Sequence, residues 1–181
     1  MGSKLSRERP SASPASDEVR AILNDLRLLV RELRISARDA EKGLGISGAQ
    51  LFVLQCLEGA GVLSMGELAE RTHTDQSSVS VVVSRLSDAR LVTRAPSPSD
   101  ARRIEVRLSA KGRSLVRVAP EATQVRLGQA LVAMSPASRT RLRRGLSELA
   151  SQMNLAGAPR MFFEDEAVVS RRAKRSRTKD E

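Results

Sequence analysis

Side chains that can hydrogen-bond to the edges of DNA bases are concentrated between residues 76 and 85. A glutamine amide can pair bidentately with adenine, a serine hydroxyl can donate or accept, and a valine can pack on the thymine methyl group. The candidate base-contacting residues are Gln76, Ser77, Ser78, Ser80, Val81, Ser84 and Arg85. The alternative for Val81 is an ordinary exposed apolar residue, which is common on protein surfaces.

These residues can act together only if a helix presents them on one face. Asp75 is a suitable N-cap, and apolar residues recur at helical spacing at positions 79, 82, 83 and 86. The β-branched run at 79–83 favours a strand by propensity alone. Because the cap, the period and the length all agree on a helix, we predict a recognition helix whose N-terminal residues approach the bases.

An arginine-rich hairpin is predicted after this helix. Residues 91–94 and 104–108 have strand character, and Pro-Ser-Pro-Ser-Asp at 96–100 is a turn between them. The candidate DNA-binding residues of this wing are Arg94, Asp100, Arg102 and Arg103. Its arginines suit a narrow minor groove, whereas phosphate would repel the Asp100 carboxylate. The alternative is a solvated turn with a surface ion pair that contributes about 0–1 kcal/mol. From 85 to 117 the chain has nine Lys and Arg against three Asp and Glu, which favours the DNA interpretation.

Helical periodicity and capping residues predict the elements around this segment. An amphipathic helix is expected over about 17–42, and capping boxes at Ser47 with Gln50 and at Ser64 with Glu67 begin two further helices. After the hairpin, residue 109 caps a helix that we expect to be bent or interrupted around Pro120 and to run to about 134. A Ser-Pro pair at 135–136 begins the last helix.

The order of these elements predicts the fold class. It is mainly α with a small β-hairpin wing, a winged helix-turn-helix flanked by N- and C-terminal dimerisation helices. The first and the last two helices carry apolar stripes that the small winged core cannot cover alone, so a second copy is the expected partner. We predict a disordered arm at 1–16, a folded domain at 17–156 and a basic, disordered tail at 157–181. Within the domain, dimerisation helices are expected at about 17–42 and 109–156, and a DNA-binding lobe at about 47–108.

The overall charge also points to a polyanionic partner. A formal net charge of +10 and a pI near 11.2 suit binding to DNA, although an anionic membrane surface attracts the same charge. The apolar runs are too short to cross a bilayer and no signal peptide is visible, so a cytoplasmic protein is expected. Aromatic residues make up only 2% of the chain, which disfavours stacking on single strands and leaves double-stranded DNA as the expected partner.

The chain resembles the MarR family of bacterial transcription regulators over about residues 17–153. The resemblance rests on Glu-Leu-Ala-Glu-Arg-Thr at 67–72, Ser-Ser-Val-Ser at 77–80, the wing signature Asp-x-Arg at 100–102 and Leu-Ser-Ala-Lys-Gly at 108–112. It implies a homodimer on a palindromic operator, Asp100 holding Arg102 in place, and often an acidic aromatic effector between the two lobes. Arg90 departs from the glycine usual there, and it costs about 1 kcal/mol if the backbone is left-handed.

Three other features give weaker indications of a functional site. Gly-x-Gly-x-x-Gly at 43–48 matches a dinucleotide fingerprint, but it follows a polar helical segment rather than a strand. Cys56 is interpreted as a packing residue, with a thiol sensor as the disfavoured alternative because no basic neighbour is evident in the sequence. His73 lies in the helix-turn-helix turn, where it could contact phosphate or cap a helix. One histidine and one cysteine exclude a Cys/His zinc site, and we expect neither an enzyme nor a cofactor.

The predicted function is a sequence-specific, double-stranded DNA-binding transcription regulator that acts as a homodimer. A small-molecule effector is an open part of this prediction. It would be anionic or apolar, because Phe52 is the only aromatic residue in the predicted domain. The alternative function is an architectural DNA-binding protein without sequence preference, for which the basic tail at 157–181 would supply non-specific affinity. A tail without any role is equally compatible with the composition.

Overall fold

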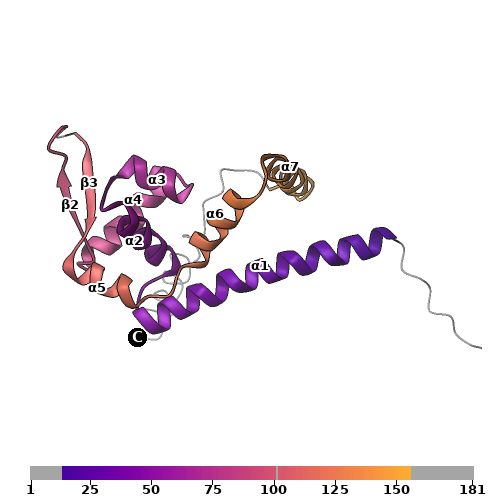
Figure 1. The fold of residues 1–181 in the computed structure, drawn as a ribbon, viewed down its shortest axis with the longest axis horizontal. Coiled ribbons are helices and arrows are strands. Elements are labelled where there is room, and N and C mark those ends of the chain that lie inside the picture. The colour runs from indigo at the N-terminus through magenta and orange to yellow at the C-terminus, as the bar shows by residue number, and fades with distance from the viewer. Residues whose placement is uncertain (1–13, 101, 156–181) are drawn as a thin grey trace, which may run out of the picture.

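The computed structural model describes residues 14–100 and 102–155 and shows a helical protein with one small sheet (Figure 1). The elements are α1 (Pro14–Leu44), α2 (Gly48–Ala60), β1 (Val62–Ser64), α3 (Met65–Thr72), α4 (Gln76–Asp88), β2 (Val92–Pro96), β3 (Ile104–Leu108), α5 (Ala110–Val118), α6 (Thr123–Ala133) and α7 (Pro136–Gln152). The predicted fold class is confirmed. Residues 14–16, which we assigned to the N-terminal arm, belong to α1. The rest of that arm and the predicted tail at 157–181 lie outside the described residues.

The winged lobe, formed by α2 to α5 and the sheet, is built around α2. Its predicted capping box is present: Gln50 N–H donates to Ser47 Oγ at 3.1 Å, and Ser47 N–H donates to the Gln50 side chain at 2.8 Å. The side chains of Leu51, Leu54 and Leu57 have almost no solvent contact. Because α1, α3, α4, α5 and β3 all contact α2, this helix is the centre of the hydrophobic core.

The sheet contains a third strand, β1, that was not predicted from the sequence. β3 lies in the middle, antiparallel to β2 on one side and to β1 on the other. β1 has only three residues, follows Gly61 with its φ of 81°, and ends at Ser64, which also caps α3. Three residues are too few for an alternating pattern, so only the pairing with β3 identifies this strand. The pairing joins the wing to the beginning of α3.

Helix α5 packs on the winged lobe, although we had grouped it with the dimerisation segment. Gly112 brings the α5 backbone against the end of the hairpin: a Cβ added there would lie 2.0 Å from the Leu91 carbonyl oxygen. One turn further along, Val116 is buried in the core. The close approach requires glycine for its lack of a side chain, and it fixes the angle at which α5 leaves β3.

A short joint separates α5 from α6 around Pro120, so of the predicted bend or interruption the chain has the interruption. The Gln55 side chain of α2 holds this joint. Its Nε2 donates to the Pro120 carbonyl at 2.8 Å, and its Oε1 accepts from Ala122 N–H at 2.9 Å. On the other side, Thr123 N–H donates to Ser36 Oγ of α1 at 3.3 Å. The joint is therefore tied to both the winged lobe and α1.

The turn after α4 has left-handed backbone at Arg90, with a φ of 59°. Side chains at the start of α5 support this turn. Ser109 Oγ donates to the Arg90 carbonyl at 2.7 Å, and the Lys111 ammonium donates to the Ala89 carbonyl at 3.1 Å. These bonds offset the strain of about 1 kcal/mol that a non-glycine residue meets in this conformation.

Two helices extend away from the winged lobe and expose apolar stripes. In Figure 1, α1 runs from the base of the lobe well beyond it, and α6 leads to α7 on the same side. Exposed apolar residues of α1 and α7 include Val19, Ile22, Leu23, Leu29, Val30, Leu142, Leu146 and Leu149, and Met153 follows directly after α7. Along the whole described length of α7 no side chain is buried.

The contact at Gly112 predicts a large effect of a single methyl group. Gly112→Ala should lower the free energy of unfolding by about 1–3 kcal/mol, because the new Cβ collides with rigid backbone. In α3, Gly66→Ala meets open space and should leave stability unchanged or raise it by up to about 1 kcal/mol. Urea unfolding followed by circular dichroism measures both. Equal stability of the two variants would contradict the packing of α5 on the Leu91 carbonyl.

Candidate nucleic-acid interface

Helices α3 and α4 form the predicted helix-turn-helix. At the start of α3 the capping box is present: Glu67 N–H donates to Ser64 Oγ at 3.3 Å, and Ser64 N–H donates to the Glu67 carboxylate at 2.7 Å. His73 ends α3 with left-handed backbone, a φ of 52°, and its N–H donates to the Glu70 carbonyl at 3.1 Å. His73 therefore caps α3 through its backbone, which is one of the two roles we considered.

Helix α4 turns its apolar face inward, as predicted. Val79, Val82, Val83 and Leu86 are buried against the rest of the winged lobe. The outer face carries most of the candidate base-contacting residues: Gln76, Ser77, Ser80, Val81 and Ser84 are exposed, whereas Ser78 and Arg85 are half-buried. Val81 is 54% exposed, so this valine projects into solvent among polar neighbours. The sequence prediction thus places five candidate residues on one accessible surface of a single helix.

Asp75 organises the first turn of α4 more extensively than a cap alone requires. Its carboxylate accepts from Ser78 N–H at 2.9 Å and from Ser78 Oγ at 2.7 Å, and it also accepts from the Ser77 hydroxyl. The hydrogen bonds from Ser77 and Ser78 hold the pKa of Asp75 well below its ordinary value. The sequence indicates Asp75 as the cap, but its two hydroxyl contacts were not predicted. The Asp-x-Ser-Ser spacing was the available signal for them.

The wing turn is ordered by backbone hydrogen bonds around Asp100. Asp100 Oδ1 accepts from the backbone N–H of Arg102 at 3.0 Å, and the Asp100 carbonyl accepts from Arg103 N–H at 2.9 Å. Ser97 N–H closes the hairpin by donating to the Arg103 carbonyl at 2.8 Å. The resemblance implied that Asp100 holds Arg102. In the structure the contact is made to the Arg102 backbone, and the Arg102 side chain is exposed.

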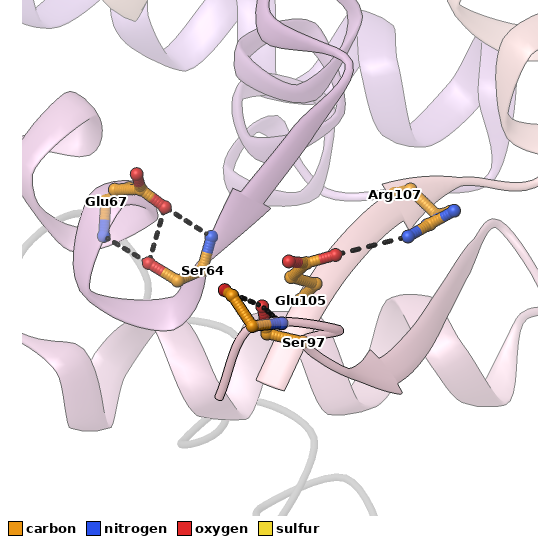
Figure 2. A network of polar contacts seen from close by, with 6 residues as sticks. Ser64, Glu67, Ser97, Glu105 and Arg107 are labelled. Atoms are coloured by element: carbon orange, nitrogen blue, oxygen red, sulfur yellow. Dashed lines mark hydrogen bonds and ion pairs between the residues drawn. The ribbon is translucent and has the colours of Figure 1, made fainter. Parts of the chain in front are cut away.

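Arg103 has a different position from the other wing arginines. Its Nη2 donates to Ser64 Oγ at 3.3 Å, and Ser64 Oγ in turn donates to the Glu67 carboxylate at 2.6 Å. Figure 2 shows Ser64 and Glu67 facing each other, with Ser97 and Glu105 nearby. The pKa of Glu67 is lowered, first by its hydrogen bonds with Ser64 and further by the Arg103 charge. Arg103 thus links the wing to the start of α3, a contact across 39 residues of sequence that no local pattern indicates.

Arg94 and Arg107 place two further cations on the hairpin. Both side chains are exposed, Arg94 on β2 and Arg107 on β3. The Arg107 guanidinium pairs with the Glu105 carboxylate at 3.2 Å, as Figure 2 also shows. Because this pair is exposed to solvent, it offsets the Arg107 charge only in part.

A cleft of about 600 Å³ lies between the winged lobe and α6. Its lining includes Phe52 and Cys56 of α2, Arg71 and His73 at the end of α3, and Gln124 of α6. Burial raises the pKa of the Cys56 thiol to about 11, and the nearby Arg71 charge lowers it only in part. The structure therefore supplies a basic neighbour that the sequence did not reveal. Burial nevertheless keeps the thiol protonated at neutral pH, which disfavours the sensor interpretation.

Other chemistries find no support in the described part of the chain. The glycines at 43–48 join two helices, α1 and α2, where a dinucleotide site requires a preceding strand. Gly48 instead allows close packing, since a Cβ there would lie 3.2 Å from the Ala37 backbone. Across residues 14–100 and 102–155 there is no cluster of three or more metal-ligating His, Cys, Asp or Glu side chains, and no helix that could span a membrane.

Comparison with known proteins agrees with this geometry. A sequence model of the MarR family matches residues 44–103. An HTH-type transcriptional regulator of Mycobacterium tuberculosis is 33% identical over 122 residues, which cover 67% of this chain and 85% of that protein.

Two solved structures share the fold, each at 20% sequence identity. A mutant of MarR from E. coli, complexed with operator DNA, has a TM-score of 0.52, and the alignment covers 76% of this chain and 99% of that one. BldR from Sulfolobus solfataricus has a TM-score of 0.51, with 78% and 99% covered. With an exposed recognition helix, an arginine-bearing wing and a relative of this similarity, the chain belongs to the MarR family and is a DNA-binding transcriptional regulator.

Proposed function

We propose that the protein acts as a homodimer that reads an inverted-repeat operator with two α4 helices and two wings. The observation that carries this proposal is the pair of apolar stripes on α1 and α7. Ile22 is 55% exposed and Leu146 is 48% exposed in the single chain. Continuous apolar surface on two helices that extend from the lobe marks an interaction surface, and a twofold dimer would bury both.

A twofold dimer fixes the form of the operator. Recognition helices of such dimers enter successive major grooves about 34 Å apart, so the two half-sites should be separated by one helical turn. In each half-site the exposed face of α4 would contact base edges, and Arg94 and Arg102 would contact phosphates or the adjacent minor groove. A chromosomal operator places this activity in the cytoplasm.

The cleft between the lobes is the proposed site of an effector. Gln124 Oε1 is buried there and accepts no hydrogen bond from the described residues, and an unsatisfied buried acceptor costs about 1–3 kcal/mol. Arg71 supplies a positive charge, and Phe52 an apolar wall. A small organic acid with an apolar body and one hydroxyl or N–H donor satisfies all three groups. Because Gln55 also lines the cleft and holds the joint before α6, such a ligand would shift the spacing of the two α4 helices.

Substitutions in the two stripes test the dimer. Leu26→Asp in α1 and Leu146→Asp in α7 should each shift the protein toward monomers, because an unpaired charge in a buried interface costs several kcal/mol. Leu28→Asp is the matched control: Leu28 is 57% exposed but lies on the opposite side of α1 from the stripe. Sedimentation velocity measures the oligomeric state. Dimers that survive both stripe substitutions would refute this interface.

Salt dependence separates the wing from the recognition helix. Arg102→Ala should weaken binding to every sequence and reduce the slope of log K against log salt by about one, the contribution of one phosphate contact. Ser80→Ala or Val81→Ala should instead change the preferred sequence by about 1–3 kcal/mol per lost base contact. Arg126→Ala on α6 is the control for a lost surface cation. Footprinting and fluorescence anisotropy provide the readouts. Uniform protection without a discrete footprint would favour the architectural alternative, and a preference altered by Arg102→Ala alone would reverse the assigned roles.

Ligand titration tests the cleft. Phenolic carboxylates should weaken operator binding, and Arg71→Gln should lower the ligand affinity by about tenfold through loss of a charge-assisted hydrogen bond. Arg144→Gln on α7 removes a charge outside the cleft and should leave the response intact. The measurement is operator affinity by anisotropy across a panel of such acids. If none of them changes it, the protein is insensitive to this class of effector.

A further inference from the structure

From the contacts of Asp75 we infer that this carboxylate sets the hydrogen-bonding polarity of the first turn of α4. Ser77 and Ser78 then accept hydrogen bonds from the exocyclic amino groups of adenine or cytosine and do not donate to guanine or thymine. The inference rests on the proposed use of α4 as the base-reading helix, and it names the class of base edge that this turn selects.

Asp75 makes more contacts than helix capping needs. A cap requires one side-chain oxygen to accept from a backbone N–H of the first turn, and Asp75 Oδ1 does so with Ser78 at 2.9 Å. In addition, the Ser77 hydroxyl donates to the same oxygen, and the Ser78 hydroxyl donates to Oδ2 at 2.7 Å. Both hydroxyl protons therefore point back toward the carboxylate.

The carboxylate fixes the direction of both bonds because an ionised carboxylate can only accept. The lowered pKa of Asp75, caused first by the two serine hydroxyls, keeps it ionised at neutral pH. A serine hydroxyl has one proton and two lone pairs, so a hydroxyl whose proton is engaged presents only lone pairs to an approaching base. A serine hydroxyl elsewhere can bond to donors and acceptors on a base alike, whereas in this turn it can only accept hydrogen bonds from base donors.

This polarity discriminates between bases in the major groove. The donors there are adenine N6–H₂ and cytosine N4–H₂, whereas guanine O6 and N7 and thymine O4 are acceptors. Every base pair has one such amino group, so the selection appears as adenine or cytosine on the contacted strand in place of guanine or thymine. Ser77 is exposed and Ser78 half-buried, which makes Ser77 the principal reader. The Asp75 charge also repels phosphate from the positive end of α4, so the first turn faces bases.

Selection from a randomised duplex library separates polarity from capping. The full-length wild-type chain, Asp75→Asn and Ser77→Ala go through the same selection at fixed salt, and the position that changes in Ser77→Ala is the one Ser77 contacts. Asparagine caps a helix as well as aspartate, but its amide can donate to the serine oxygens and release the hydroxyl protons.

At the Ser77-dependent position, the wild type should favour adenine or cytosine by about tenfold over guanine or thymine. Asp75→Asn should lose this preference and yet unfold at the same temperature as the wild type. If Asp75 served only to stabilise the helix, a variant of unchanged stability would keep the preference. Asp88→Asn, at the other end of α4, removes the same charge and should keep the preference.

Base analogues test the contact atom without changing the protein. In the selected duplex, purine in place of adenine or 2-pyrimidinone in place of cytosine removes only the amino group. The wild type should then lose about tenfold in affinity, and Ser77→Ala should lose nothing further. Two outcomes would refute the inferred polarity of the hydroxyl groups: selection of guanine or thymine at the Ser77-dependent position, or an unchanged preference in Asp75→Asn. Either would leave the proposed base reading by α4 intact. A wild-type selection that enriches no sequence would instead overturn the proposed base reading, and this inference with it.

Discussion

Every part of the winged lobe depends on the burial of α2. Its leucines at 51, 54 and 57 have almost no solvent contact, and each contributes roughly 1.5–3 kcal/mol relative to an exposed side chain. Because α4 packs on this helix through its own apolar face, the polar face of α4 has to point away from the core. The Gln55 side chain of α2 also holds the joint that leads to α6. One buried helix thus determines both the direction of α4 and the place where α6 leaves the lobe.

Three acidic side chains near the proposed DNA-binding surface accept hydrogen bonds from the protein itself. A carboxylate that accepts hydrogen bonds keeps its negative charge and still repels phosphate, so the places where these acids are held limit where phosphate can approach. Asp75 accepts from two serines, Asp100 from the Arg102 backbone, and Glu67 from Ser64. These three acids shape the turns that present the cations and hydroxyls. The electrostatic potential of this surface therefore depends on the positions of the negative charges as well as on the formal net charge of +10.

Local sequence signals predicted the elements with short-range determinants. The capping boxes at Ser47 and Ser64 and the apolar period of α4 involve residues three or four positions apart, so the sequence alone was sufficient for α2, α3 and α4. Features created by distant partners were not predictable in this way. β1 exists only through its pairing with β3, and Arg103 reaches Ser64 across the fold. The packing of α5 depends on the close approach of Gly112 to the Leu91 carbonyl, two residues that are far apart in the sequence.

The same division between local and distant contacts shows how the proposed base reading and the proposed effector response would coexist in one small chain. The first turn of α4 is organised by Asp75 and its two serines, all within four residues, so its chemistry does not depend on the position of the second copy. The joint at residues 119–122 depends on hydrogen bonds from both α2 and α1, so it is sensitive to any change in the cleft beside it. A ligand there would leave the hydrogen-bonding pattern of each α4 unchanged and move the two helices relative to each other. Such a ligand alters affinity for the whole operator without altering which bases each half-site prefers.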